Sequence, residues 1–163
     1  MTDVVYVNKD DEVIGGGSIS DGVMQGVVFR ASRVLLINEH GEALLQQRSS
    51  DMLLYPSRWN ESATGHVDVG EEYIDAAARE LQEEISVSDI ILTELGTFFA
   101  EEIAPEGLPR YSFNRLYVGV YPETMLPSVD PKEVAQVRWV PFDELATWIN
   151  EKPEDFPQRQ CKA

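Results

Sequence analysis

Apolar stretches separated by short polar turns predict strands in the first part of the chain. Residues 3–7 and 12–14 are apolar and flank a polar turn, an arrangement typical of a β-hairpin. Residues 34–38 and 43–47 flank a second polar turn and predict a second hairpin. Between the hairpins, Gly15-Gly16-Gly17 is expected to interrupt regular structure.

The middle and end of the chain continue the strand pattern. Residues 51–64 include Pro56 and are expected to form a loop that ends in a short strand. Further strands are expected from apolar runs at 90–100, 111–121 and 134–140. A final helix is expected over 141–150, with Pro153 after its end.

One segment has helical rather than alternating spacing. Over residues 72–85, apolar side chains recur every three or four positions, which predicts an amphipathic helix. The predicted apolar stripe consists of Ile74, Ala77, Ala78, Leu81 and Ile85. The acidic residues 71, 72 and 75 lie where the positive end of the helix dipole favours them.

The order of these elements predicts an α+β fold. A mixed β-sheet is expected to lie between helices. The helices follow runs of strands in the sequence, and an apolar face of the resulting sheet must be covered. No repeat or linker divides the sequence, so residues 1–163 are expected to form one domain, with residues 1–27 as an N-terminal β-hairpin extension.

The net charge limits the classes of ligand that the protein is expected to bind. Thirteen Lys and Arg residues against 29 Asp and Glu residues give a net charge of −16. Such a chain repels polyanions, so a nucleic acid polymer is not expected as a partner. A small phosphorylated ligand requires a locally positive field, which clustered carboxylates provide when they bind a divalent cation.

The sequence also indicates a compartment. No apolar run approaches the ~20 residues needed to cross a bilayer, so no membrane association is expected. The first residues lack the basic and apolar regions of a signal peptide, and the single cysteine, Cys161, allows no internal disulfide. A cytoplasmic location is expected.

Candidate chemistry lies on the predicted helix over 72–85. Glu80, Glu83 and Glu84 are spaced i, i+3 and i+4, so three carboxylates share one side of the helix. Their mutual repulsion is relieved either by full solvation or by a bound cation. Oxygen ligands suit Mg²⁺, Mn²⁺ or Ca²⁺ better than Zn²⁺.

The residues around this acidic face decide between those alternatives. The segment from Gly65 to Val87 reads GHVDVGEEYIDAAARELQEEISV and resembles the Nudix box, the signature of the Nudix hydrolases. Eight of its nine fixed positions match, namely Gly65, Glu71, Arg79, Glu80, Leu81, Glu83, Glu84 and Val87. The exception is Ser86, where the family has a glycine in a left-handed capping geometry.

This resemblance implies a fold and an activity. The implied fold is an α/β/α sandwich, and the implied enzyme is a pyrophosphohydrolase that uses Mg²⁺, with Mn²⁺ as a substitute, to cleave a diphosphate bond. The implied substrate is a small phosphorylated, nucleotide-derived molecule, and a homodimer is compatible with the family. The implied metal ligands are Glu80, Glu84, Glu83 and the carbonyl of Gly65. The implied catalytic residues are Glu80, Arg79, Glu83 and Glu71, in which Arg79 orients a carboxylate and Glu71 braces the loop.

Residues outside the box leave alternatives open. A further base is expected from one of Glu101, Glu102 and Glu133, each of which is otherwise a surface acid. Arg48 and Arg110 are expected either to contact phosphate or to form salt bridges. The aromatic residues Tyr55, Trp59 and Phe99 stack on a base or belong to the core, and His66 contacts the substrate or packs in its loop.

Several short segments resemble isopentenyl-diphosphate isomerases, which share the Nudix fold. They include residues 45–49, Pro56, Trp59 and Gly65-His66. The isomerase cysteine is expected two residues before His66, where this chain has Thr64, and its three-histidine metal site cannot be built from two histidines. A hydrolase is therefore preferred, with a non-catalytic nucleotide-binding module and the isomerase as alternatives.

Overall fold

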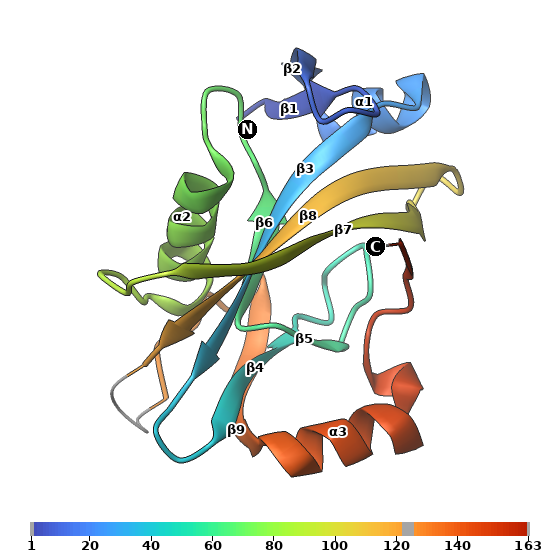
Figure 1. The fold of residues 1–163 in the computed structure, drawn as a ribbon. Helices are drawn as coiled ribbons and strands as arrows, with labels where there is room; N and C mark the ends of the chain where they lie inside the picture. Colours follow the sequence, from blue (N-terminus) through green and yellow to red (C-terminus); the bar gives the residue numbers. More distant parts are fainter. Residues whose placement is uncertain (1, 122–125, 163) are drawn as a thin grey trace.

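One mixed sheet organises the computed structural model, which describes residues 2–121 and 126–162 (Figure 1). Its strands are β1 Val4–Val7, β2 Val13–Gly17, β3 Val28–Ile37, β4 Glu42–Arg48, β5 Trp59–Asn60, β6 Ala63–His66, β7 Thr93–Ile103, β8 Pro109–Val120, β9 Val134–Pro141 and β10 Gln160–Lys162. Its helices are α1 Ile19–Gln25, α2 Tyr73–Ile85 and α3 Phe142–Glu151, followed by a 3₁₀ turn at Pro153–Asp155.

The sheet is mixed because one central pair of strands is parallel. β3 runs parallel to β8 over its whole length, whereas the other paired strands are antiparallel. Among the strands that the structure describes, β6 pairs only with β3, so its other edge can meet side chains of α2. The predicted α+β class with a mixed sheet is confirmed.

The N-terminal region differs in part from the prediction. β1 and β2 form the expected hairpin, but the glycines at 15–17 belong to β2 and do not interrupt it. Helix α1 was not predicted, because only one turn of apolar residues marks it. Its boundaries are set by Ser18, whose Oγ accepts a hydrogen bond from Asp21 N, and by Gly26 with φ of 70°.

Two layers cover the sheet on opposite faces (Figure 1). Leu36 of β3 packs in the cluster that includes α2, whereas its neighbour Leu35 packs in the cluster that includes α3. Trp59 lies in that second cluster, with its ring 5.5 Å from the ring of Trp148, so it is a core residue. None of the helices in the described residues is long and apolar enough to cross a bilayer.

Helix α2 buries a different stripe from the one predicted. Ile74 and Ala78 are exposed, while Tyr73 and Ala76 are buried beside Ala77. The buried residues that complete this face are Leu81, Ile85, Glu80 and Glu84. The helix is thus rotated toward its acidic side, because it packs against β6 and against polar groups that meet the two carboxylates.

Candidate functional site

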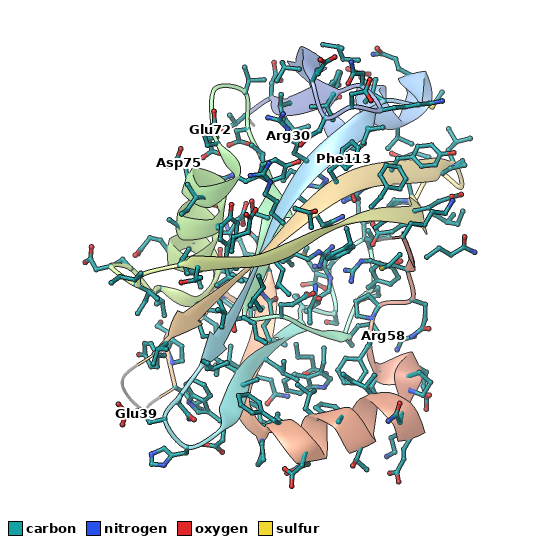
Figure 2. All side chains as sticks on the ribbon, viewed as in Figure 1. Arg30, Glu39, Arg58, Glu72, Asp75 and Phe113 are labelled. Atoms are coloured by element: carbon teal, nitrogen blue, oxygen red, sulfur yellow. The ribbon has the colours of Figure 1, made fainter. Side chains whose placement is uncertain are left out.

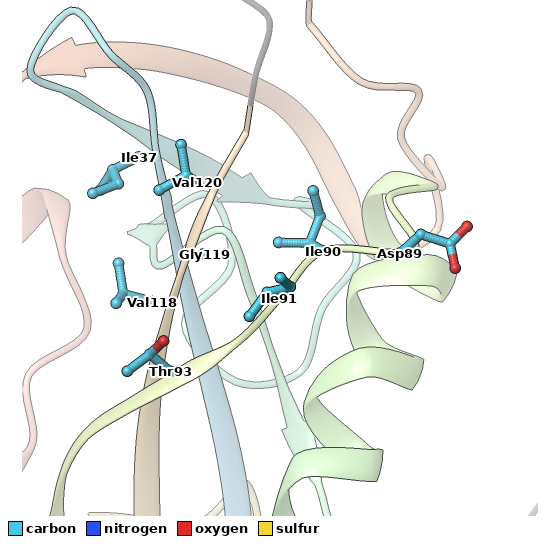
Figure 3. Close-up of a pocket in the computed structure, with 8 residues that line it drawn as sticks. All are labelled: Ile37, Asp89, Ile90, Ile91, Thr93, Val118, Gly119 and Val120. Carbon is cyan, nitrogen blue, oxygen red and sulfur yellow. The ribbon is translucent and has the colours of Figure 1, made fainter.

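One apolar cavity has none of the predicted site residues in its lining. Its volume is about 470 Å³, and Figure 3 shows its lining of Ile37, Asp89, Ile90, Ile91, Thr93, Val118, Gly119 and Val120. Asp89 is its only ionisable lining residue, and none of the predicted site residues borders it. The candidate site is therefore built from the charged network between α2 and β6.

Arg79 is the centre of this network. Its Nε and Nη2 donate to the two oxygens of Glu71 at 2.8 and 3.0 Å, and its Nη1 donates to Glu80 Oε1 at 2.7 Å. Nη2 also donates to the carbonyl of His66 at 2.9 Å. This fork joins the loop, the helix and strand β6, since a guanidinium offers several donors in one plane. Asp68 also belongs to the network, since its Oδ2 lies 3.6 Å from Arg79 Nη2, but no spacing in the sequence marked it.

Glu84 is held at the free edge of β6. Its Oε1 accepts a hydrogen bond from Thr64 N at 2.8 Å, and its Oε2 accepts one from Gln46 Nε2 at 3.0 Å. Glu84 is 2% exposed and Glu80 is 8% exposed. The third acid of the motif, Glu83, is exposed and contacts Arg79 at 3.3 Å. The structure thus separates two buried carboxylates from one surface carboxylate.

Gly65 is sterically required in β6. A Cβ atom at this position would lie 2.1 Å from Glu80 Cδ, far inside van der Waals contact. The Glu80 carboxylate therefore lies directly against the Gly65 backbone, and any larger residue would displace it. This close approach explains why position 65 of the motif requires a glycine.

The two buried carboxylates carry an unbalanced charge. Burial, reinforced by Glu84, raises the pKa of Glu80 to about 8. Burial also raises the pKa of Glu84 to about 7, against the opposing effect of the hydrogen bonds from Gln46 and Thr64. A cation between them would stabilise both anions.

These donors suit a hard cation better than zinc. In the part of the chain that the structure describes, no three His, Cys, Asp or Glu side chains are gathered as a metal site, and Arg79 contacts Glu80 Oε1. Mg²⁺ is typically bound through one or two carboxylates while substrate phosphates and waters complete its shell. Two buried carboxylates beside the Gly65 backbone fit that kind of shell.

The candidate bases are separated by the fold. Glu102 is buried and paired with Arg159, and its Oε2 lies 3.9 Å from Arg110 Nε, so its charge is already engaged. Glu101 lies on β7, opposite Gln160 of β10. Glu133 is near α2, because Asp130 N donates to the carbonyl of Glu84 at 2.9 Å and the charge of Glu133 helps raise the pKa of Glu84.

Both ends of α2 are capped by local hydrogen bonds. Ser86 has φ of 59° and ψ of 35°; its N–H donates to the carbonyl of Gln82 at 3.1 Å, and the N–H of Val87 donates to the carbonyl of Leu81 at 3.2 Å. This is the left-handed capping geometry expected of a glycine at this position. At the other end, Glu72 N donates to Asp75 Oδ2 at 3.4 Å, and both residues lie at the first turn (Figure 2).

The ring of His66 packs against Phe29 and also contacts the guanidinium of Arg110. Its ring lies 5.6 Å from that of Phe29 in an edge-to-face arrangement, and its Nε2 is 2.8 Å from Arg110 Nη2. Because arginine only donates, Nε2 accepts, and the ring is neutral with its proton on Nδ1. Burial and then Arg110 hold the pKa of His66 well below its usual range.

Two arginines near His66 were missed by sequence reasoning. Arg33 interrupts the apolar run of β3, and it donates to Asn114 Oδ1 at 2.8 Å and to Glu61 Oε2 at 3.2 Å. Arg159 pairs with Glu102 and lies over the ring of Tyr55. A charged residue inside a buried strand was the signal for Arg33, whereas only the tertiary structure brings in Arg159.

Comparison with known families and proteins places these features in context. A family profile described as "NUDIX domain" matches residues 28–161. An uncharacterised Nudix hydrolase of Pseudomonas aeruginosa is 36% identical over 99 residues, which is 61% of this chain and 59% of that protein. Isopentenyl-diphosphate Delta-isomerase 2 of Photorhabdus laumondii is 30% identical over 153 residues, covering 94% of this chain and 85% of that enzyme.

Solved structures have the same fold. The crystal structure of DR0079 from Deinococcus radiodurans has a TM-score of 0.73 and 24% identity, covering 91% of this chain and 89% of that one. The NUDIX domain of Shewanella oneidensis NrtR, complexed with ADP ribose, has a TM-score of 0.57 and 16% identity, covering 84% of this chain and 98% of that one. Proteins of this fold therefore include one that binds a nucleotide-derived small molecule.

Proposed function

The chain belongs to the NUDIX domain family, and from that premise we propose that it is a divalent-metal-dependent hydrolase. Its substrate would be a nucleoside diphosphate linked to another group, or a related small phosphorylated metabolite, cleaved at the diphosphate bond. The observation that carries this proposal is the pair of buried carboxylates, Glu80 and Glu84, fixed by Arg79, Thr64 N and Gln46.

Mg²⁺, or Mn²⁺ in its place, would be held by Glu80, Glu84 and the backbone of Gly65, with exposed Glu83 at the rim. When bound, the cation lowers the pKa of an attacking water and offsets charge on the leaving phosphate. Arg79 orients Glu80 through Nη1 while its bidentate contact with Glu71 keeps the loop against the helix. The protein groups are thus positioned before any substrate arrives.

Among the three candidate bases, Glu133 is supported best. Burial and its acidic neighbours Asp130 and Glu83 raise its pKa, which favours proton uptake near neutral pH. Its carbonyl accepts a hydrogen bond from Ser49 N at 2.9 Å, so its backbone is anchored to the end of β4. We assign to Glu133 the acceptance of the proton from the attacking water.

A second candidate function is favoured by one comparison. The isopentenyl-diphosphate isomerase of Photorhabdus laumondii is similar over nearly the whole chain. The residues expected for isomerase chemistry are not all present, however, since this chain has Thr64 where the resemblance places a cysteine. His40 is exposed in the turn between β3 and β4, and His66 is engaged with Arg110. The hydrolase therefore remains the proposal.

The deciding experiment measures phosphate and nucleotide release across nucleoside diphosphates, nucleoside triphosphates, nucleotide sugars, dinucleotides and isopentenyl diphosphate. Each is incubated with Mg²⁺, with Mn²⁺ and with a chelator. We expect cleavage of at least one member that requires the metal. Isomerisation of isopentenyl diphosphate without phosphate release would favour the second candidate, and ligand-induced thermal shifts without turnover would favour a nucleotide-binding module.

A further inference from the structure

Four arginines from distant parts of the chain gather beside β6, in a protein with a net charge of −16. They come from β3, β4, β8 and the segment before β10. This arginine cluster consists of Arg33, Arg48, Arg110 and Arg159. Arg48 Nε donates to the carbonyl of Leu54 at 2.9 Å, next to Tyr55, whose ring lies against Arg159. In keeping with this placement, Arg159, Arg110 and Arg33 each lower the pKa of Arg48, after the larger effect of burial.

Glu102 connects two members of the cluster, Arg110 and Arg159. Glu102 of β7 lies opposite Arg110 of β8 in the sheet, and its two oxygens face Arg110 and Arg159 separately. Arg110 Nη2 lies 2.8 Å from Nε2 of His66 on β6. Arg33 of β3 pairs with Thr64 of β6. The aromatic rings of Tyr55 and Phe98 lie against Arg159 and Arg33.

The cluster has more positive charge than its own acidic partners neutralise. Glu102 and Glu61 are the only carboxylates that form ion pairs with it in the described residues. Three of its side chains are 15% exposed or less, so water screens their repulsion poorly. Arg110 Nε is buried and has no hydrogen-bond partner among the described residues. An incoming anion would satisfy both the charge and the donors.

This cluster is continuous with the carboxylate site. Gly65 faces Glu80, and side chains alternate along a strand, so Thr64 and His66 face away from α2. Arg48 joins the two sides, because Gln46, two residues before it on β4, donates to Glu84 Oε2 at 3.0 Å. The charges of Glu84 and of the other three arginines both affect the pKa of Arg48. A ligand that lies along the free edge of β6 would therefore meet both regions.

We propose that the arginine cluster binds a second anionic group of the substrate, a phosphate ester or a carboxylate on a part of the molecule outside the diphosphate. This inference rests on the proposed hydrolase function, since it places the diphosphate at Glu80 and Glu84. It predicts that substrates with a neutral remainder are poor, because they leave the guanidiniums unneutralised.

Two matched pairs of compounds test this specificity. Coenzyme A differs from dephospho-coenzyme A by one phosphate ester, and UDP-glucuronate differs from UDP-glucose by one carboxylate. We expect kcat/KM to favour the charged member of at least one pair by about tenfold or more. Equal kcat/KM within both pairs would overturn the proposal.

The variant Arg159→Gln identifies the residues responsible. It should reduce the preference for the charged member to within about twofold, whereas Arg159→Lys should retain most of it. Arg58→Gln is the matched control, since Arg58 is exposed on the loop beside the C-terminal segment (Figure 2). An equal loss with both members of a pair would indicate a structural role and contradict the inference.

Binding without turnover separates this inference from the proposed function. Protein freed of metal on a chelating resin is titrated with inorganic pyrophosphate against sodium chloride of equal ionic strength, and its melting temperature is recorded. We expect a rise in Tm that Arg159→Gln and Arg48→Gln diminish and Arg58→Gln preserves. The absence of any rise in the wild-type protein would overturn the inference. A rise in a protein that hydrolyses nothing would overturn only the hydrolase.

Discussion

The two faces of β6 contain opposite charge imbalances. On the α2 side, Glu80 and Glu84 are buried, with Arg79 paired to Glu80 and Arg48 as the cation that lowers the pKa of Glu84. On the other side, four guanidiniums share two carboxylates. Each face is destabilised by its own charges, and each would be stabilised by a partner of opposite sign. The proposed cation and the proposed polyanionic substrate would together meet both needs.

The largest expected effect removes the charge from the carboxylate side. Glu84→Gln keeps the size of the side chain but weakens any contact with a cation, so we expect turnover to fall by about 10³-fold or more. Pyrophosphate binding by the metal-free protein should be unchanged, because the arginine cluster is intact. Glu151→Gln, at an exposed position on α3, is the control. Unchanged turnover in Glu84→Gln would remove the assignment of the metal site.

A smaller effect is expected from a substitution at Gly65, whose backbone lies between the two charged regions. In Gly65→Ala the added methyl group would collide with Glu80, so we expect a loss of about 1–3 kcal/mol in the free energy of unfolding. Turnover should fall as Glu80 moves. Urea denaturation measures the first effect, and Gly96→Ala is the control because nothing lies within 4 Å of a Cβ added there.

The pH dependence of stability should report on the two carboxylates of the α2 side, against an opposing contribution from His66, whose pKa is lowered. The pKa values of Glu80 and Glu84 are raised above those of the unfolded chain, so the native state retains protons that the unfolded state loses. Their contribution to stability is therefore greatest in acid and is lost as the pH rises to about 8. We expect the metal-free protein to lose ~5 °C of Tm between pH 6 and 8.

Two controls sharpen this measurement. Mg²⁺ should reduce the fall in Tm, because it stabilises the ionised carboxylates. Glu80→Gln should also reduce it, because one of the titrating groups is gone. If Tm rises steadily over the same range in the metal-free wild-type protein, the raised pKa values are contradicted.

The smallest effect concerns the end of α2. Ser86 holds a left-handed conformation that a glycine adopts without strain, so Ser86→Gly should increase the free energy of unfolding by about 0.5–1 kcal/mol. Turnover should remain within about twofold of the wild-type value, because the carboxylates do not move. Thermal denaturation and the hydrolysis assay together check this, and a destabilised variant would count against the strained-cap account.

The carboxylate side could be predicted from sequence because its parts are close along the chain. Residues 65–84 comprise the end of β6, one loop and most of α2, and helical spacing alone brings Glu80 and Glu84 to one side. Their burial could not be predicted, since it depends on contacts with Gln46 and Thr64 from other strands. For the same reason, Ile74 was expected in the apolar stripe but is exposed.

The arginine side could not be assembled from sequence. Arg48 and Arg110 were recognised as candidate phosphate contacts, but nothing local connects them to Arg33 or Arg159. Their meeting depends on the parallel pairing of β3 with β8 and on the return of β10 to β7. Likewise, Glu102 could not be distinguished from Glu133 as a base until its pairing with Arg159 was seen.

Strand β6 has a consequence for substrate length. Its four residues separate the two charged regions, and its backbone is fixed in register by the pairing of Ala63, Thr64, Gly65 and His66 with β3. The separation between the proposed cation site and the proposed anion site is thus set by a strand held in register by its neighbour. If both sites are occupied by one substrate, analogues whose second anion is displaced by one or two bonds should be discriminated by length as well as by charge.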